Sequence, residues 1–164
     1  MTQELIQENE NYEQGPRGLG GWLIIPIIGL FLSPLINLFN MILNIQLINS
    51  TNWTKLTTPG GDSYHSMFKP ALYFETGCNV LYILISIYLL VLLFQKKKLL
   101  PKLIIFYYIF NVVIEILITV LVNKINADIG TPPVSFSIPA IISSLIWIAY
   151  FRKSKRVKNT FVND

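Results

Sequence analysis

The most reactive side chain inside the apolar parts of this sequence is the carboxyl group of Glu115. It lies in the run LIIFYYIFNVVIEILITVLV, with Asn111 four residues before it and Thr119 four residues after it. Residues four apart lie on one face of a helix, so these polar groups would form a stripe. No Lys or Arg lies deep in the run, which favours a protonated acid that donates to a neighbour. The stripe could line a proton-linked or polar path, or it could hold helices together.

Comparable stripes occur in the other apolar runs, and we expect all four to face inward together. They comprise Glu75, Asn79 and Tyr82 with Cys78 beside them; Asn37, Asn40 and Asn44; and Ser143, Ser144 and Trp147. Hydrogen bonds between helices contribute about 0.6 kcal/mol each in membranes, so we interpret the asparagines as contacts that fix helix register. For Glu115 both interpretations stay open, because a charge at the bilayer centre costs about 2.5–3.5 kcal/mol on insertion scales. Glu75, near a helix end, is better explained as an interfacial carboxylate with Lys69 as a candidate partner.

Catalytic and metal-binding patterns are weak in this sequence. His65, Asp62 and Glu75 are loosely spaced, and a surface histidine without a role explains them better. The single cysteine, Cys78, excludes an internal disulfide and is more often a packing residue than a nucleophile. We therefore expect no catalytic residues, no metal, no cofactor and no enzymatic activity.

Four long apolar runs must position these polar groups. They cover residues 21–48, 71–94, 103–122 and 134–151, in a chain with 52% hydrophobic and 13% charged residues. Each approaches or exceeds the roughly 20 residues that a helix needs to cross a bilayer. The runs show no strand-like alternation. The sequence thus predicts an all-α integral membrane four-helix bundle over residues 19–151, between an acidic, disordered tail (1–18) and a basic tail (152–164).

The positive charges predict how this protein is oriented. The side of the two termini holds ten of them, against three on the opposite side, where Lys55, Lys69 and Lys124 lie. The ten are Arg17, Lys96, Lys97, Lys98, Lys102, Arg152, Lys153, Lys155, Arg156 and Lys158. Short basic segments stay in the cytoplasm, so we expect both termini inside.

The basic tail itself has several interpretations. Anchoring at anionic headgroups, shared with Lys96, Lys97 and Lys98, is the simplest, at about 1 kcal/mol per charge. Nucleic-acid binding is disfavoured because aromatic residues are sparse there. The mixture of basic residues with Val157, Phe161 and Val162 also fits a segment that lies along the headgroups or docks in a groove of this protein or a partner.

Three motifs resemble the bacterial membrane-protein family catalogued as domain of unknown function 2569, over about residues 18–162. The entry motif is represented by Gly20, Gly21, Trp22 and Leu23, and the basic connector by Pro101. The terminal pattern comprises Tyr150, Phe151, Ser154, Arg156, Val157, Lys158, Thr160, Phe161 and Val162. The resemblance implies a protein of the bacterial inner membrane with four spans. It implies no activity.

Three function classes stay open at this point. A structural or partner subunit of an envelope or membrane system needs no catalytic constellation and fits best; its partner would be another membrane protein or a second copy. The alternative is a small transporter or channel with Glu115 in a polar path. Against it, four helices are few for a monomeric route, and no inverted repeat is evident. An intramembrane enzyme ranks last, because no catalytic motif is visible.

Overall fold

The computed structural model describes residues 15–61 and 63–164, and within these ranges the chain is helical, with no strand. In chain order the elements are η1 (Gly21–Leu23), α2 (Ile24–Ile48), α3 (Asn52–Thr57), α4 (Phe68–Phe94), α5 (Leu100–Asp128), α6 (Ile138–Lys153) and α7 (Lys155–Thr160). The all-helical prediction is therefore confirmed.

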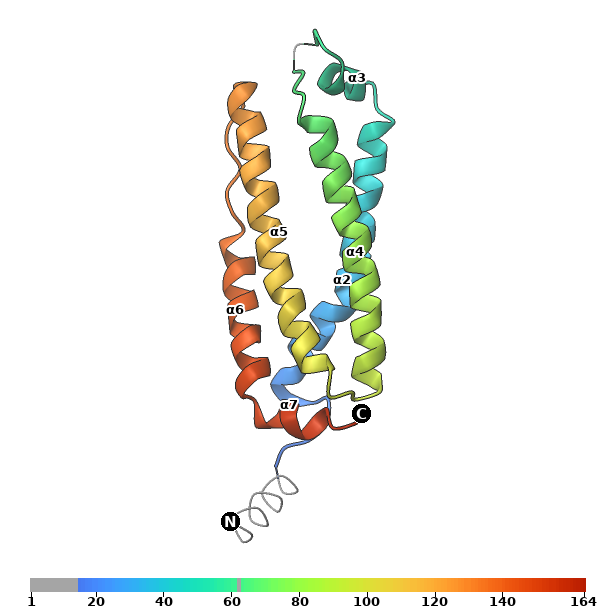
Figure 1. Ribbon diagram of the computed structural model, residues 1–164, viewed down its shortest axis with the longest axis vertical. Helices are drawn as coiled ribbons and strands as arrows, with labels where there is room; N and C mark the ends of the chain where they lie inside the picture. The colour runs from blue at the N-terminus through green and yellow to red at the C-terminus, as the bar shows by residue number, and fades with distance from the viewer. Residues whose placement is uncertain (1–14, 62) are drawn as a thin grey trace.

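The long helices form two hairpins that lie side by side (Figure 1). In one, α2 packs along α4; in the other, α5 packs along α6. Contacts between α4 and α5 join the hairpins. The short helices close opposite ends, with α3 at one and α7 at the other, beside the C-terminus (Figure 1).

Three helical segments are long and apolar enough to cross a membrane. They are Gly21–Ile48, Phe68–Phe94 and Leu100–Asp128, of 28, 27 and 29 residues. Their outer faces expose large apolar side chains such as Leu35, Leu84 and Phe106. Such surfaces suit a hydrocarbon solvent and would be costly in water. The chain is accordingly a multi-pass membrane protein.

Two of the helices are longer than the apolar runs that they contain. The run 71–94 belongs to a helix that begins at Phe68, and the run 103–122 belongs to α5, which extends from Leu100 to Asp128. Hydropathy ended the prediction at Val122 because polar residues follow. The helix continues because the side chains of Asn123 and Asn126 find partners on the segment that comes next.

The fourth predicted span, 134–151, was wrong about its first residues. The helix α6 begins at Ile138, and residues 131–137 have no regular secondary structure. Pro132 and Pro133 explain the irregular segment, because proline lacks the N–H that a helix interior requires. Pro139 lies in the first turn of α6, where a missing N–H costs nothing. With 16 residues, α6 is shorter than a full membrane span.

Much of the tightest packing lies at the end that α7 closes. Leu23, Leu100 and Val157 are each no more than 1% exposed there, and Phe151 and Phe161 are also buried. These residues come from η1, α5, α6 and the α7 region, so this end gathers segments from both termini of the described chain.

Candidate functional site

A cavity of about 480 Å³ lies between α2, α5 and α6. Its α2 wall includes Pro26, Gly29 and Leu30, and the other walls come from α5 and α6; these are Ile104, Tyr107, Tyr108 and Asn111, and Ala140, Ser143, Ser144 and Trp147. Pro34, inside α2, removes a backbone hydrogen bond of the kind that keeps a helix straight. The volume is within the range of about 300–1,000 Å³ that small-molecule sites occupy.

Hydrogen bonds tie α2 to α5 beside this cavity. The hydroxyl groups of Ser33 and Tyr107 are 2.5 Å apart. The amide of Asn37 donates to the Ser33 carbonyl at 2.7 Å, and that of Asn111 donates to the Tyr107 carbonyl at 3.0 Å. The Tyr107 ring also packs edge-on against Tyr82 of α4, with centroids 5.9 Å apart. Ser33 and Tyr107 are therefore held in place, and Tyr107 lines the cavity.

Other polar groups on the cavity wall remain available. Within the described part of the chain, the Tyr108 hydroxyl, the Ser143 hydroxyl and the Trp147 indole N–H make no side-chain hydrogen bond, whereas the Ser144 hydroxyl donates to the Ala140 carbonyl at 2.9 Å. None of the residues that line the cavity is charged. The available groups are thus mainly neutral hydrogen-bond donors.

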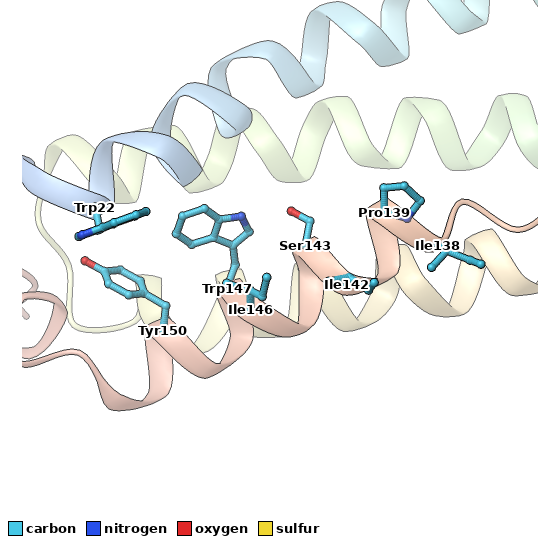
Figure 2. Close-up of a pocket in the computed structure, with 8 residues that line it drawn as sticks. All are labelled: Trp22, Ile138, Pro139, Ile142, Ser143, Ile146, Trp147 and Tyr150. Atoms are coloured by element: carbon cyan, nitrogen blue, oxygen red, sulfur yellow. The ribbon is translucent and has the colours of Figure 1, made fainter.

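A groove of about 590 Å³ continues from the cavity along α6. Ser143 and Trp147 line both spaces. Figure 2 shows these two side chains rising from α6 towards α2, with the indole nitrogen of Trp147 on the side of Ser143. At one end, Trp22 from the start of the first span lies over Tyr150 (Figure 2). The rest of the lining is apolar, namely Ile138, Pro139, Ile142 and Ile146.

The polar residues predicted to face inward together do lie away from the exposed surface, with one exception. None of Asn37, Asn40, Asn44, Glu75, Asn79, Tyr82, Asn111, Glu115, Thr119, Ser144 and Trp147 is exposed, whereas Ser143 is. They do not converge on one path. Asn37 and Asn111 flank the cavity, Asn44 bonds Thr76 at 3.2 Å between α2 and α4, and Glu75 lines a small crevice between α4 and α5. The amide nitrogen of Asn79 is buried without a partner among the residues described.

Glu115 makes a contact that the sequence did not predict. Its carboxylate accepts a hydrogen bond from the backbone N–H of Ser137 at 3.3 Å, and Ser137 is the residue that precedes α6. The first N–H groups of a helix lack partners within the helix, and the Glu115 oxygen supplies an acceptor next to them. Asn123 extends this pattern, because its side chain bonds both the N–H and the carbonyl of Val134, at 2.7 and 3.0 Å.

The residues proposed at the outer end have other partners than expected. The Nε2 atom of His65 lies 2.8 Å from a carboxylate oxygen of Asp128, and its Nδ1 accepts the N–H of Met67, so His65 links the loop before α4 to the end of α5. Lys69 lies 6.0 Å from the centre of the Tyr73 ring, and the structure shows no ion pair of it with Glu75 among the described residues. Asp62 lies outside the described residues. No cluster that could hold a metal is found in the ranges described.

The motif residues of the two termini meet at the end closed by α7. An added Cβ on Gly21, whose φ is +62°, would lie 3.3 Å from the Arg156 guanidinium, and one on Gly20 would lie 3.6 Å from it. The N–H of Gly18 donates to the Thr160 hydroxyl at 2.9 Å, and Arg156 donates to the Arg17 carbonyl at 3.1 Å. The entry motif and the terminal pattern therefore form one structural unit.

The remaining motif residues support this unit. Ser154 precedes α7 and accepts the N–H of Val157, while Pro101 lies in the first turn of α5. Of the predicted anchoring residues, Arg152, Lys153, Lys155 and Lys158 are exposed. Docking of the tail on this protein, one of the alternatives considered, is what the structure shows for Val157 and Phe161, which are buried.

The connector between α4 and α5 also binds the end of the tail. Asn163 exchanges backbone hydrogen bonds with Lys96 and Lys98, at 3.1 and 2.8 Å, and its amide donates to the Gln95 carbonyl at 2.7 Å. The Lys98 ammonium lies 2.8 Å from the Asp164 carboxylate, and this hydrogen bond, assisted by the charge, lowers the pKa of Asp164. Asn163 has no signal in the sequence that sets it apart from other polar tail residues.

Sequence reasoning missed several residues that shape the site. Tyr107 and Tyr108 read as ordinary aromatic residues of an apolar run, although Tyr107 lies four residues before Asn111 and so shares its face. Asn123 and Asn126, three residues apart, follow the third predicted span, which ends at residue 122. Their spacing on one helix face was the available signal.

Comparison with known proteins agrees with the structure. The family model described as protein of unknown function (DUF2569) matches residues 16–162. The chain is similar to the inner membrane protein YdgK of Escherichia coli (strain K12), with 24% identity over 151 residues that cover 90% of this chain and 96% of that protein. No solved structure matches the chain.

Proposed function

We propose a function for this chain on the premise that it belongs to the family of membrane proteins of unknown function DUF2569. Our proposal is that it is a non-catalytic subunit of the bacterial inner membrane. In this proposal it has four crossings, and it binds another membrane protein through residues 134–136. The relative YdgK, which is named an inner membrane protein, supports the location.

The fourth crossing combines the irregular segment 131–137 with α6. Seven residues reach up to about 23 Å when extended, at roughly 3.3 Å each. The 16 residues of α6 add about 24 Å at 1.5 Å each. Together they match the roughly 43 Å of the antiparallel helix α5, which has 29 residues. The contacts of Asn126, Asn123 and Glu115 with Pro132, Val134 and Ser137 support this pairing, because they follow α5 inward in order.

One observation carries the proposal: the irregular segment is exposed at membrane depth. Ser137 pairs with Glu115 near the middle of α5, which supports placing Ser135 and Phe136 within the bilayer in this proposal. Residues 131–136 are all exposed, and, within the part of the chain that the structure describes, the N–H and carbonyl of Ser135 and the N–H of Phe136 have no hydrogen-bond partner. Irregular backbone is not tolerated against lipid, because each unpaired group costs several kcal/mol. A protein surface that covers this segment satisfies that requirement.

The fate of the polar residues favours this role over transport or catalysis. Asn44 bonds Thr76 of α4, and Glu115 bonds Ser137 before α6, which is how side chains that hold helices together behave. Asn111 bonds the Tyr107 carbonyl of its own helix. The Glu115 carboxylate faces the start of α6, where it stabilises the break between the irregular segment and the helix.

Photo-cross-linking in native membranes tests the proposal. A photoreactive amino acid at Ser135 should give an adduct with a different membrane protein, identified by mass spectrometry. The same amino acid at Leu84, which is 59% exposed on α4, is the matched lipid-facing control and should give no protein adduct. An adduct of twice the chain mass would replace the partner with a second copy. Labelling at Ser135 that is limited to lipid would overturn the proposal.

A further inference from the structure

The cavity and the groove adjoin at Ser143 and Trp147, and the two spaces differ in chemical character. The cavity holds neutral polar groups at Asn111, Ser143 and Trp147, and the groove is bordered by Ile138, Ile142 and Ile146. The shared residues Ser143 and Trp147 stand at the junction (Figure 2). A single molecule that fills both parts must be polar at one end and apolar along the other.

The lining determines the chemistry of the polar end. Neither the cavity nor the groove is lined by Lys, Arg, Asp or Glu. An ionised headgroup buried there would lose its hydration without a compensating charge, at a cost of many kcal/mol. This argues against the phosphate of a phospholipid and against a fatty acid carboxylate.

The available hydrogen-bonding groups narrow the choice further. Ser143 offers a hydroxyl and Trp147 an indole N–H, and the Tyr108 hydroxyl lies on the same cavity wall. The Asn111 amide nitrogen is occupied by the Tyr107 carbonyl. Donors that lack acceptors are satisfied by a ligand that carries carbonyl oxygens. Three aromatic side chains, Tyr107, Tyr108 and Trp147, add walls against which a flat polar group can pack.

We infer that this space binds an uncharged amphiphile with a carbonyl-bearing headgroup in the cavity and one apolar chain in the groove along α6. A quinone with an isoprenoid or alkyl chain has this chemistry, and so does a monoacylglycerol. Residues 134–136 do not line the cavity or the groove, so ligand binding can be tested without the proposed partner.

Intrinsic fluorescence provides the test, because Trp22 and Trp147 border the groove. The purified protein with Trp53→Phe, in phosphatidylcholine nanodiscs, is titrated with a quinone that carries a ten-carbon chain and quenches tryptophan. We expect saturable quenching in addition to the linear quenching from quinone dissolved in the bilayer. Mono-oleoylglycerol, which does not quench, is then added as a competitor. If fluorescence recovers at a mono-oleoylglycerol concentration below that of the quinone, the ligand is assigned as an acylglycerol. If fluorescence does not recover, the ligand is assigned as a quinone.

Variants locate the binding. Ser143→Phe fills the junction, and Ile142→Phe narrows the groove from a position that is 52% exposed, where folding is not at risk. Both should weaken saturable quenching by tenfold or more. Leu145→Phe adds comparable bulk on the lipid side of α6 and should leave binding unchanged. Two results would rule the site out. One is quenching that only rises linearly with quinone concentration in the protein without groove substitutions, and the other is saturable quenching that is equal in Ile142→Phe and Leu145→Phe.

Discussion

At the scale of single residues, Gly21 lies where the entry motif packs against Arg156 of α7. Its φ of +62° is a left-handed conformation, and the Arg156 guanidinium lies against the place where a side chain would begin. Only glycine accepts both conditions, since other residues pay about 1–2 kcal/mol for this conformation. The family-like Gly-Gly-Trp-Leu entry therefore has a physical basis in the docking of α7.

Gly21→Ala should lower the free energy of unfolding in detergent by about 1–2 kcal/mol. Thermal unfolding measures the effect, and cysteine labelling near Val157 reports whether α7 has detached. Gly77→Ala is the matched control, because an added methyl group there meets no atom within 4 Å. Equal stability of the two variants would show that Arg156 does not constrain the entry.

At the scale of elements, α6 begins beside the middle of α5 because α5 supplies the groups that allow the chain to be irregular before it. The segment before α6 contains Pro132 and Pro133. Along it, Pro132, Val134 and Ser137 bond the side chains of Asn126, Asn123 and Glu115 in turn. Each of these side chains replaces a backbone partner that a continuous helix would have provided. The irregular segment before α6 therefore depends on the polar side chains of α5 for its hydrogen bonds.

Replacing Glu115 separates this structural role from proton transport. Glu115→Gln keeps an oxygen that accepts the Ser137 N–H, so stability should change little. Glu115→Leu leaves that N–H unpaired and should cost about 1–3 kcal/mol, measured by thermal unfolding in detergent. Proton flux into vesicles should be absent in all forms. A pH-dependent flux that Glu115→Gln abolishes would instead favour the transporter alternative.

The sequence predicted the helical class, the membrane and the first span closely, because long apolar runs have few other solutions. It erred where local chemistry overrides hydropathy. Val134 and Phe136 are apolar, yet the prolines before them and the Asn123 side chain keep this stretch irregular. The cavity could not be predicted, because Gly29, Asn111 and Ser143 lie on three different helices and meet only through tertiary packing.

At the scale of the whole molecule, the two termini of the described chain converge on one end. The hydrogen bond between Gly18 and Thr160 and the burial of Leu23 with Val157 and Phe161 require the chain to return to the side from which it entered. Three long helices alone would leave the tail on the opposite side. The contact is therefore an argument that α6 and its irregular lead-in complete a fourth crossing.

Fusion reporters test this geometry and its direction together. The basic residues Arg17, Lys96–Lys98, Lys102 and those of the tail gather at the end closed by α7, so the positive-inside rule predicts that this end is cytoplasmic. A fluorescent protein that matures only in the cytoplasm should be bright when fused after Asp164, and alkaline phosphatase should be inactive there. The phosphatase should be active when inserted at Pro59, between α3 and α4, on the opposite side. An active phosphatase at the C-terminus together with a cytoplasmic N-terminus would mean that the chain crosses three times, and the contact between Gly18 and Thr160 could then not form within one molecule.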